Sequence, residues 1–386
     1  MKTAAIICEY NPFHYGHRYL IEKTREAGAT HIAAVMSGNF TQRGDVAVFD
    51  KYIRAKTALE NGVDLVIELP TMYSLSAAEG FAAGAVGIIE SLGCVDMLSF
   101  GSECGELSVL KEASGACEYA VHTDSFHGLM KSGQSYPAAL AAVVKELYTD
   151  DVSEVLKSPN NTLAIEYLNA LDGIGSVIEP FTVTREGAAH DSDEAGKFSS
   201  ASLIRKMISS GEDYSRYAPA VDAPSADIKR LERAILARLR AMRREDFEQL
   251  YDGANGLAER LYKAVRKAGT LDELYFLTKT KRYTLARIRR AVLCGYLGLS
   301  KGQLLIPNAY VRVLGMNSKG KEILSAAKCA LPVDTSLKAL SKTSRAAHRQ
   351  AAFEERCGDL YSLAFEKPAP CGRELTASPV IMEIIT

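Results

Sequence analysis

The sequence lacks the features that mark several large classes of protein. Its 386 residues include eight widely spaced cysteines and no CxxC pair, which argues against a zinc ribbon or a disulfide framework. No apolar run approaches the roughly 20 residues of a membrane span, and the short N-terminal apolar run ends too early for a signal peptide. No Gly-rich P-loop is present, which argues against γ-phosphate transfer. We therefore expect a cytoplasmic protein with reduced thiols, no metal site and no membrane partner.

The net charge is close to zero, because 46 Lys and Arg residues oppose 47 Asp and Glu residues. The charges are unevenly distributed, however. Residues 206–300 hold 19 basic and 12 acidic residues, whereas the rest of the chain holds 27 and 35. A basic segment in a neutral protein is typical of polyanion binding, and a solvated helical surface is the alternative interpretation.

Short apolar runs alternate with amphipathic stretches over the first 100 residues. Strands are predicted at 3–8, 31–36, 65–69 and 95–100, and helices at 17–27, 50–61 and 77–92. This order is typical of an α/β fold with a doubly wound parallel sheet, whose ligands bind beyond the carboxyl ends of the strands. Residues 105–172 look helical, and 176–184 look like a fifth strand. The length fits two domains, and a Ser-, Pro- and Gly-rich stretch near 208–225 separates 1–208 from a mainly helical domain at 209–386. Arg-rich helices are expected there at 227–244 and 283–298.

The segment Glu9–His17, with sequence EYNPFHYGH, lies where the first strand ends and the first helix begins. His14 and His17 are three residues apart, so both imidazoles face one side of the first helical turn. Gly16 leaves room for a nucleotide to approach the backbone. This pattern places donors where charge develops on an α-phosphate during nucleotidyl transfer. The alternatives are a metal site, for which no third ligand stands nearby, and a capping or core role.

A Ser-rich string, SSASLIRK, begins at Ser199. Ser199 or Ser200 would cap a helix, and together with Ser202 and Arg205 would hold the β- and γ-phosphates. Ser-rich helix starts are common, so this string is specific only in combination with the upstream HxGH.

Six strings, in this order, resemble the bacterial tRNA(Met) cytidine acetate ligase family of the HxGH nucleotidyltransferase-like superfamily: EYNPFHYGH, SGNFTQRG, ELP, SFGSE, PNNTLAIEYLNAL and SSASLIR. The resemblance runs to about residue 210 and continues less sharply through KTKRYTLARIRR. It implies that ATP, with Mg²⁺, activates acetate as acetyl-adenylate. The acetyl group then passes to the wobble cytidine of elongator tRNA(Met), giving N4-acetylcytidine. One departure is Ala189 before His190–Asp191, where the family pattern has an aromatic residue.

The resemblance also implies site residues, with His14, His17 and Arg205 as the catalytic set. Besides the Ser-rich string, the implied ATP site consists of Ile7, Cys8, Glu9, Tyr10, Asn11, Pro12, Phe13, His14, Tyr15, Gly16, His17, Arg18, Tyr19, Leu20, Gly101, Arg185 and one of Asn160 and Asn161, of which Asn160 is preferred. Without the resemblance, Gly101 would be a strand-ending turn, Asn160 a helix cap and Arg185 a surface charge.

Two further sets concern the acetate and the RNA. Asn39 and Arg43 follow the second strand and are candidates for binding acetate or the cytidine, although a simple β–α loop explains them equally. The candidate tRNA surface consists of Arg240, Arg243, Arg244, Lys279, Lys281, Arg282, Tyr283, Arg287 and Arg290. Its cations would neutralise phosphates and Tyr283 would stack on an unpaired base, unless pairing with Glu232, Glu245 and Asp246 occupies some of them. A small-molecule adenylyl- or cytidylyltransferase and a non-catalytic, nucleotide-regulated tRNA-binding protein are the alternative functions.

Overall fold

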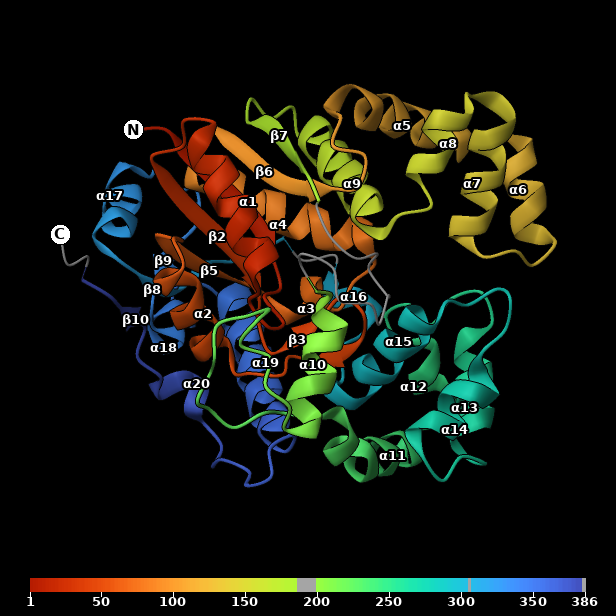
Figure 1. Ribbon diagram of the computed structural model, residues 1–386. Coiled ribbons are helices and arrows are strands. Elements are labelled where there is room, and N and C mark those ends of the chain that lie inside the picture. The colour runs from red at the N-terminus through yellow and green to blue at the C-terminus, as the bar shows by residue number, and fades with distance from the viewer. Residues whose placement is uncertain (186–198, 305–306, 384–386) are drawn as a thin grey trace.

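An eight-stranded sheet forms the centre of the molecule (Figure 1). The computed structural model describes residues 1–185, 199–304 and 307–383. The strand order is β10-β8-β5-β2-β1-β6-β7, and β9 pairs with β8 outside this path. The strands are β1 (Thr3–Cys8), β2 (His31–Ser37), β5 (Leu65–Leu69), β6 (Met97–Ser102), β7 (Glu179–Thr184), β8 (Val311–Met316), β9 (Val333–Asp334) and β10 (Val380–Ile381).

The five strands from the first half of the chain run parallel to one another. Every residue of β1, β2 and β5 is buried, as expected for strands with helices on both faces. Successive side chains enter two different apolar cores, Ile7 and Val35 one, Ile6 and Ala34 the other. The predicted doubly wound sheet is therefore confirmed.

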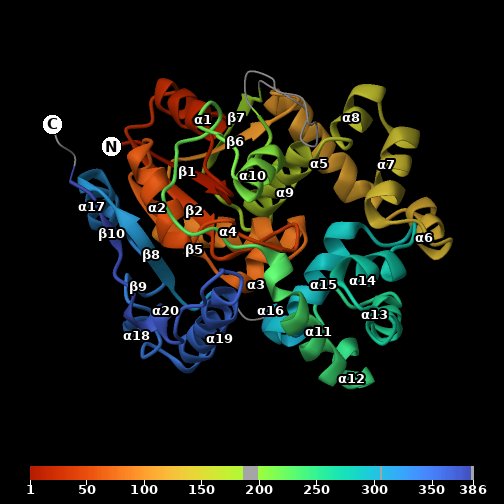
Figure 2. The same cartoon turned by 60° about the horizontal axis from the view of Figure 1, so that its bottom comes forward.

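Helices cover both faces of this sheet (Figure 2). On one face lie α1 (Tyr15–Glu26) and α2 (Lys51–Glu60), and on the other α4 (Ala78–Leu92) and α9 (Pro159–Gly173). Asp50 caps α2, since its carboxylate accepts a hydrogen bond from the Tyr52 amide at 2.9 Å. Gly93 ends α4 in the left-handed region, with φ 62°. Both helix ends agree with the sequence prediction, because capping depends on residues close in the chain.

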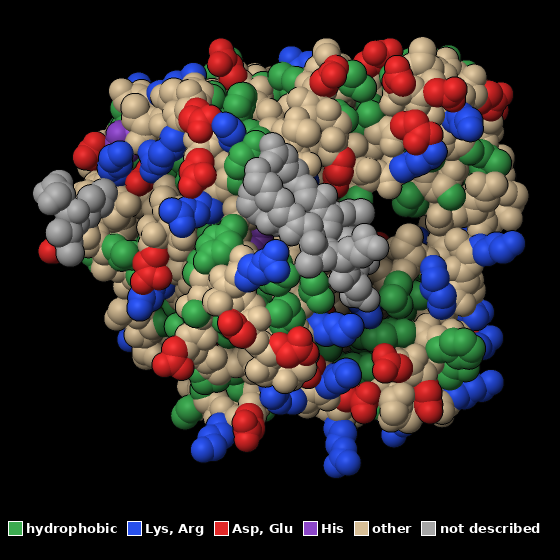
Figure 3. Space-filling view, in the orientation of Figure 1, with side chains coloured by type: hydrophobic (Ala, Val, Ile, Leu, Met, Phe, Trp, Pro, Cys, Tyr) green, Lys and Arg blue, Asp and Glu red, His purple; other side chains and the backbone are tan. Residues whose placement is uncertain are grey.

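Two groups of helices extend from the same side of the sheet (Figure 1), and the surface is hollowed between them (Figure 3). The first group is α5 (Leu107–Ala120), α6 (Asp124–Lys131), α7 (Tyr136–Leu147) and α8 (Asp150–Val155). The second group is the 3-10 turn η1 (Ile228–Leu231), α11 (Glu232–Ala241), α12 (Arg244–Glu248), α13 (Leu257–Val265), α14 (Leu271–Thr278), α15 (Leu285–Leu297) and α16 (Lys301–Leu304). Arg282 joins the groups by donating a hydrogen bond to the Met130 carbonyl at 3.1 Å.

The continuous helix predicted at 227–244 is wrong, because the chain leaves the helical conformation at Met242, with ψ 143°. Met242 is buried, and the next helix begins with its own cap. The Asp246 carboxylate accepts a hydrogen bond from the Arg243 amide at 2.8 Å. Burial of Met242 and this local cap therefore favour two short helices over one long one.

The end of the chain returns to the sheet, so the sheet does not stop at the predicted boundary near residue 208. β8 pairs antiparallel with β5 and covers what would otherwise be an open strand edge. The elements around it are α17 (Ser318–Ala326), α18 (Leu337–Leu340), α19 (Arg345–Ser362) and α20 (Arg373–Thr376).

A buried cluster of charges fastens this returning segment to the sheet. Lys51 Nζ lies 2.6 Å from carboxylate oxygens of both Glu68 and Glu374. The Arg312 guanidinium contacts the same two carboxylates, at 3.1 and 2.5 Å. Burial acts to raise the pKa of Glu374, but Lys51 and Arg312 hold that pKa below its ordinary value. Two cations and two carboxylates therefore balance one another inside the protein, as buried charges require.

The eight cysteines, all in the described part of the chain, are free thiols. Among the described residues, no helix combines the length and apolar character needed to cross a membrane.

Candidate functional site

The HxGH segment lies between β1 and α1, at the carboxyl edge of the sheet. His14 precedes α1 in an extended conformation, with φ −140° and ψ 168°. Its ring stacks on the ring of His17, with centroids 3.6 Å apart and planes 19° from parallel. The two imidazoles therefore form one unit at the start of a helix, where backbone amides and the helix dipole favour an anion.

One hydrogen bond determines the protonation pattern of His17. The His14 backbone amide donates to Nδ1 of His17 at 3.1 Å, so the neutral ring carries its proton on Nε2. Burial lowers the pKa of His17 well below its ordinary 6.5, and the neighbouring His14 and Arg185 lower it further. At neutral pH, His17 therefore presents an uncharged Nε2–H donor.

We predict that His17 remains neutral with its proton on Nε2 throughout the range around pH 6.5. Long-range ¹H–¹⁵N NMR spectra should show the Nε2–H tautomer, with no titration of this ring near pH 6.5. Because the folded-state pKa lies below the unfolded one, the unfolded chain binds more protons. The contribution of His17 to stability is then complete above pH 6.5 and is lost as the pH falls below that value. An Nδ1–H tautomer, or titration near pH 6.5, would contradict this prediction.

The Ser-rich string meets the HxGH segment in space. Arg205, on α10 (Ala201–Ser210), donates to the Asn11 carbonyl at 2.8 Å and to Ser202 Oγ at 3.1 Å. Ser200 caps α10 by accepting a hydrogen bond from the Leu203 amide at 3.2 Å, and Ser199 is buried. Two motifs almost 200 residues apart thus form one site. His190 and Asp191, with the variant Ala189, lie outside the described residues.

The structure distinguishes the two candidate asparagines at the start of α9. Asn161 is buried, and its side-chain oxygen accepts hydrogen bonds from the amides of Glu103 and Cys104, at 2.8 and 3.2 Å. It therefore serves as a structural link to the loop after β6. Asn160 is half-buried and donates to the Glu103 carboxylate at 2.6 Å. Asn160 remains the better candidate for ligand contact, and Glu103 is the group that orients it.

Gly101 lies on β6 directly beside Arg185. A Cβ atom at Gly101 would stand 3.2 Å from Cγ of Arg185, and the Arg185 amide donates to the Ser102 carbonyl at 2.9 Å. The absence of a side chain at Gly101 therefore lets the Arg185 side chain lie against the strand. Because Arg185 also affects the pKa of His17, these residues belong to the same region as the imidazole pair.

Residues at the two ends of the predicted stretch 7–20 have side chains that make core or surface contacts within the protein. Ile7 and Cys8 are buried in the cores on the two sheet faces, and Leu20 packs against the second core. Arg18 is exposed and pairs with Glu22 at 3.2 Å. Among the inner residues, the rings of Tyr10 and Phe13 lie against His17, with centroids 4.9 and 5.6 Å from that of His17.

The loop after β2 contains the short hairpin of β3 (Phe40–Thr41) and β4 (Asp45–Val46). Asn39 is buried, and its side-chain oxygen accepts a hydrogen bond from the Lys51 amide at 3.0 Å, which favours a structural role over acetate or cytidine binding. Burial raises the pKa of Glu9, and the charge of the half-buried Arg43 is one of several contributions that oppose this rise. Gly44, with φ 76°, lies against the backbone of α15, since a Cβ there would be 2.5 Å from the Arg290 nitrogen.

Sequence reasoning missed Arg54, which holds the loops of this edge together. Arg54 is 1% exposed and donates to the carbonyls of Glu9 at 2.6 Å and Ser37 at 3.1 Å. It donates to the Gly38 carbonyl as well. Glu9 follows β1, Ser37 is the last residue of β2, and Gly38 follows it. One guanidinium therefore holds the ends of both strands together. In the sequence Arg54 is one charge on a helix, and no local signal separates it from a surface residue.

The predicted RNA surface contains exposed residues and buried ones. The side chains of Arg243 and Arg244 are 79% and 57% exposed, and Arg240, Lys279 and Lys281 are exposed too. Most of these cations also contact the protein itself, and Arg243 and Arg244 pair with Asp246 and Glu259. Arg240 donates to the Ala268 carbonyl, Lys279 to the Tyr283 carbonyl, Arg282 to the Met130 carbonyl, and Arg287 and Arg290 contact Asp252.

Two members of that surface lie inside the protein. Tyr283 is 5% exposed and its hydroxyl donates to the Asn255 carbonyl at 2.6 Å, so its ring has no open face for a base. Arg290 is also buried, pairs with Asp252 at 2.9 Å and donates to the Gln42 carbonyl at 3.2 Å. Arg290 therefore links α15 to the loop after β2. A basic, Tyr-containing pattern did not distinguish these buried positions from exposed ones.

The chain is similar to known proteins over nearly its whole length. The HIGH Nucleotidyl Transferase family matches residues 1–374. The tRNA(Met) cytidine acetate ligase of Syntrophomonas wolfei is 35% identical, over 98% of this chain and 99% of the relative. The protein of the same name from Caldanaerobacter subterraneus is 37% identical, over 95% and 96%. The crystal structure of Thermotoga maritima TmcAL bound with alpha-thio ATP matches with a TM-score of 0.89 and 29% identity, over 99% of this chain and 100% of that one.

The match covers nearly the whole of each relative, including the helical groups and the segment that returns to the sheet. The chain therefore belongs to the tRNA(Met) cytidine acetate ligase family of HIGH nucleotidyl transferases.

Proposed function

We propose that the protein is an ATP-dependent tRNA(Met) cytidine acetate ligase. It activates acetate as acetyl-adenylate and transfers the acetyl group to the wobble cytidine of elongator tRNA(Met). The observation that carries this proposal is the contact of Arg205 with the Asn11 carbonyl. It brings the Ser-rich phosphate segment against the HxGH loop at the carboxyl edge of a parallel sheet, the usual ligand position of this fold.

In the first step, an acetate oxygen bonds to the α-phosphorus of ATP. The bond from that phosphorus to the bridging oxygen breaks, and pyrophosphate leaves with the electron pair. Negative charge on the α-phosphate oxygens is stabilised by the Nε2–H of His17 and by His14, and Arg205 stabilises the departing pyrophosphate. Preorganised donors of this kind supply most of the catalysis in transfers at phosphorus.

In the second step, the exocyclic amine of the cytidine bonds to the acetyl carbon. The bond between that carbon and the AMP oxygen breaks, AMP leaves, and the amine loses a proton. Arg43 is our candidate for orienting the acetate, because it lies in the loop beside Glu9.

Mg²⁺ would neutralise charge on the triphosphate during the first step. The described residues contain no group of three His, Cys, Asp or Glu that could hold a metal ion, so phosphates and water would supply most of its ligands, a common arrangement for Mg²⁺. Catalysis is assigned to residues 1–208 together with the strands that complete the sheet, and tRNA binding to helices after residue 208. The free thiols and a tRNA substrate support a cytoplasmic location.

Transfer of radiolabelled acetate to elongator tRNA(Met), with ATP and Mg²⁺, tests the proposal. We expect label on the wobble cytidine, and none on a matched transcript with uridine at that position. Acetate-dependent pyrophosphate exchange without label on the tRNA would retain the adenylation and exclude this acceptor. Absence of both signals would contradict the proposal and favour a small-molecule nucleotidyltransferase.

A further inference from the structure

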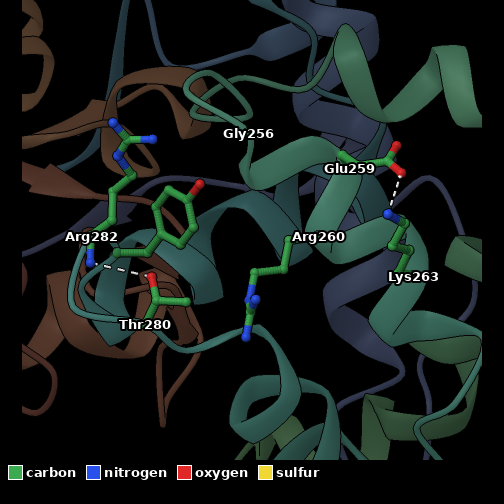
Figure 4. A pocket seen from close by; sticks show the side chains of 7 residues that line it. Gly256, Glu259, Arg260, Lys263, Thr280 and Arg282 are labelled. Atoms are coloured by element: carbon green, nitrogen blue, oxygen red, sulfur yellow. Dashed lines mark hydrogen bonds and ion pairs between the residues drawn. The ribbon is translucent and has the colours of Figure 1, made fainter. Parts of the chain in front are cut away.

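A solvent-open pocket of about 370 Å³ lies in the second helical group (Figure 4), and its lining residues include none of the HxGH or Ser-rich segments. One wall is α13, which contributes Glu259, Arg260 and Lys263. The other wall is the loop between α14 and α15, which contributes Thr280 and Arg282. Arg282 belongs to the predicted RNA surface, whereas Arg260 and Lys263 lie outside it.

The pocket is built to hold negative charge. The charged groups of Arg260 and Lys263 and one carboxylate line it, which leaves a net positive charge, whereas the guanidinium of Arg282 donates to the Met130 carbonyl. Arg260 is fixed at the wall, because its Nε donates to the Thr278 carbonyl at 2.7 Å. The residue before its helix, α13, is Gly256, which lies in the left-handed region with φ 85° and offers no side chain to cap the first turn. The start of a helix adds a favourable field for an anion.

Among the described residues that line the pocket, Glu259 is the one acidic group, and it pairs with two cations. Its carboxylate lies 3.0 Å from Lys263 and 2.8 Å from Arg244. Hydrogen bonding to Lys263 and the charge of Arg244 lower the pKa of Glu259, so the carboxylate is ionised at neutral pH. In the free protein Glu259 therefore occupies cations that an incoming anion would otherwise bind.

We propose that this pocket binds the phosphate backbone of the tRNA substrate, an inference that rests on the proposed function. A phosphate suits the pocket better than a base, because its aromatic ring, Tyr283, is buried and offers no face for stacking. A polymer suits it better than a single small anion, because further exposed cations stand next to its lining residues. Arg244 pairs with Glu259, and Arg243 precedes it in the chain. Lys281 lies between the lining residues Thr280 and Arg282 in the chain. Repeated phosphates on one strand would meet this extended set of cations.

Two substitutions at the pocket should have opposite effects on tRNA affinity. Lys263→Gln removes a cation and is expected to weaken binding about 5-fold at 0.1 M salt. The slope of log affinity against log salt should fall by about 1, because one phosphate contact is lost. Glu259→Gln frees Lys263 and Arg244, and is expected to tighten binding by a similar factor. Lys338→Gln, an exposed lysine on α18, is the matched control and should change neither quantity.

Filter binding of elongator tRNA(Met) at several salt concentrations measures these effects, with thermal unfolding to verify that each variant folds. An unchanged affinity for Lys263→Gln, or no tightening for Glu259→Gln, would overturn the pocket assignment. So would a wild-type protein that does not bind the tRNA. Acetate transfer by the wild-type protein is measured separately. Transfer without a pocket effect refutes only the pocket, whereas no transfer refutes the proposed function.

Discussion

Replacing His17 with alanine is expected to slow acetate-dependent ATP–pyrophosphate exchange by about 10²–10³-fold, the usual effect of removing one preorganised donor from a charged transition state. The substitution removes the Nε2–H donor and also the Nδ1 acceptor of the His14 amide. The stacked ring of His14 loses its partner at the same time. Exchange measured with saturating ATP and acetate isolates the first step from tRNA binding.

His17→Asn separates the two functions of this ring. Its side-chain oxygen can still accept the hydrogen bond from the His14 amide, but no donor reaches the position of Nε2. We therefore expect His17→Asn to be nearly as slow as His17→Ala. Near-normal exchange in the Asn variant would contradict the donor role and leave only a capping role. His348→Ala, at an exposed histidine on α19, is the control and should be unaffected.

Replacing Arg312 with methionine is expected to lower the free energy of unfolding by about 3–5 kcal/mol, because it leaves a buried carboxylate uncompensated. Arg312 is 2% exposed and contacts Glu68 and Glu374. Without it, Lys51 alone must balance both carboxylates. Urea unfolding followed by circular dichroism measures the loss.

The charge-balanced double variant tests this explanation. Arg312→Met with Glu374→Gln leaves Lys51 and Glu68 as a one-to-one pair. The double variant should lose less stability than the two single variants together, by about 0.5–3 kcal/mol. Additive losses would show that charge balance is not the cause. Arg349→Met, at an exposed position on α19, should change stability by less than about 0.5 kcal/mol.

Features set by neighbouring residues could be predicted from the sequence. The buried strands followed from continuous apolar runs, and the ends of α2 and α4 followed from Asp50 and Gly93. The HxGH position at the first strand–helix junction was also predicted from the order of apolar runs. The prediction placed both imidazoles in the first helical turn, whereas His14 precedes the helix in an extended conformation and meets His17 by ring stacking. The family followed from strings of residues that the comparisons match over nearly the full chain.

Features that depend on partners distant in the chain could not be predicted. Tyr283 and Arg290 have the composition of an RNA-binding surface but are buried against Asn255 and Asp252. Arg54 resembles a surface charge but ties the ends of two strands.

The sequence by itself determined the parallel sheet, the histidine pair and the family, because each depends on the order and spacing of residues along the chain. Only the tertiary structure decided which charges are buried, which cations remain exposed, and that β8 completes the sheet beside β5. The physical reason is that a side chain's exposure and partners depend on what packs against it from elsewhere in the chain. The spacing of residues along the chain shows which side chains share one face of a helix or strand. It does not show which distant segment packs against that face.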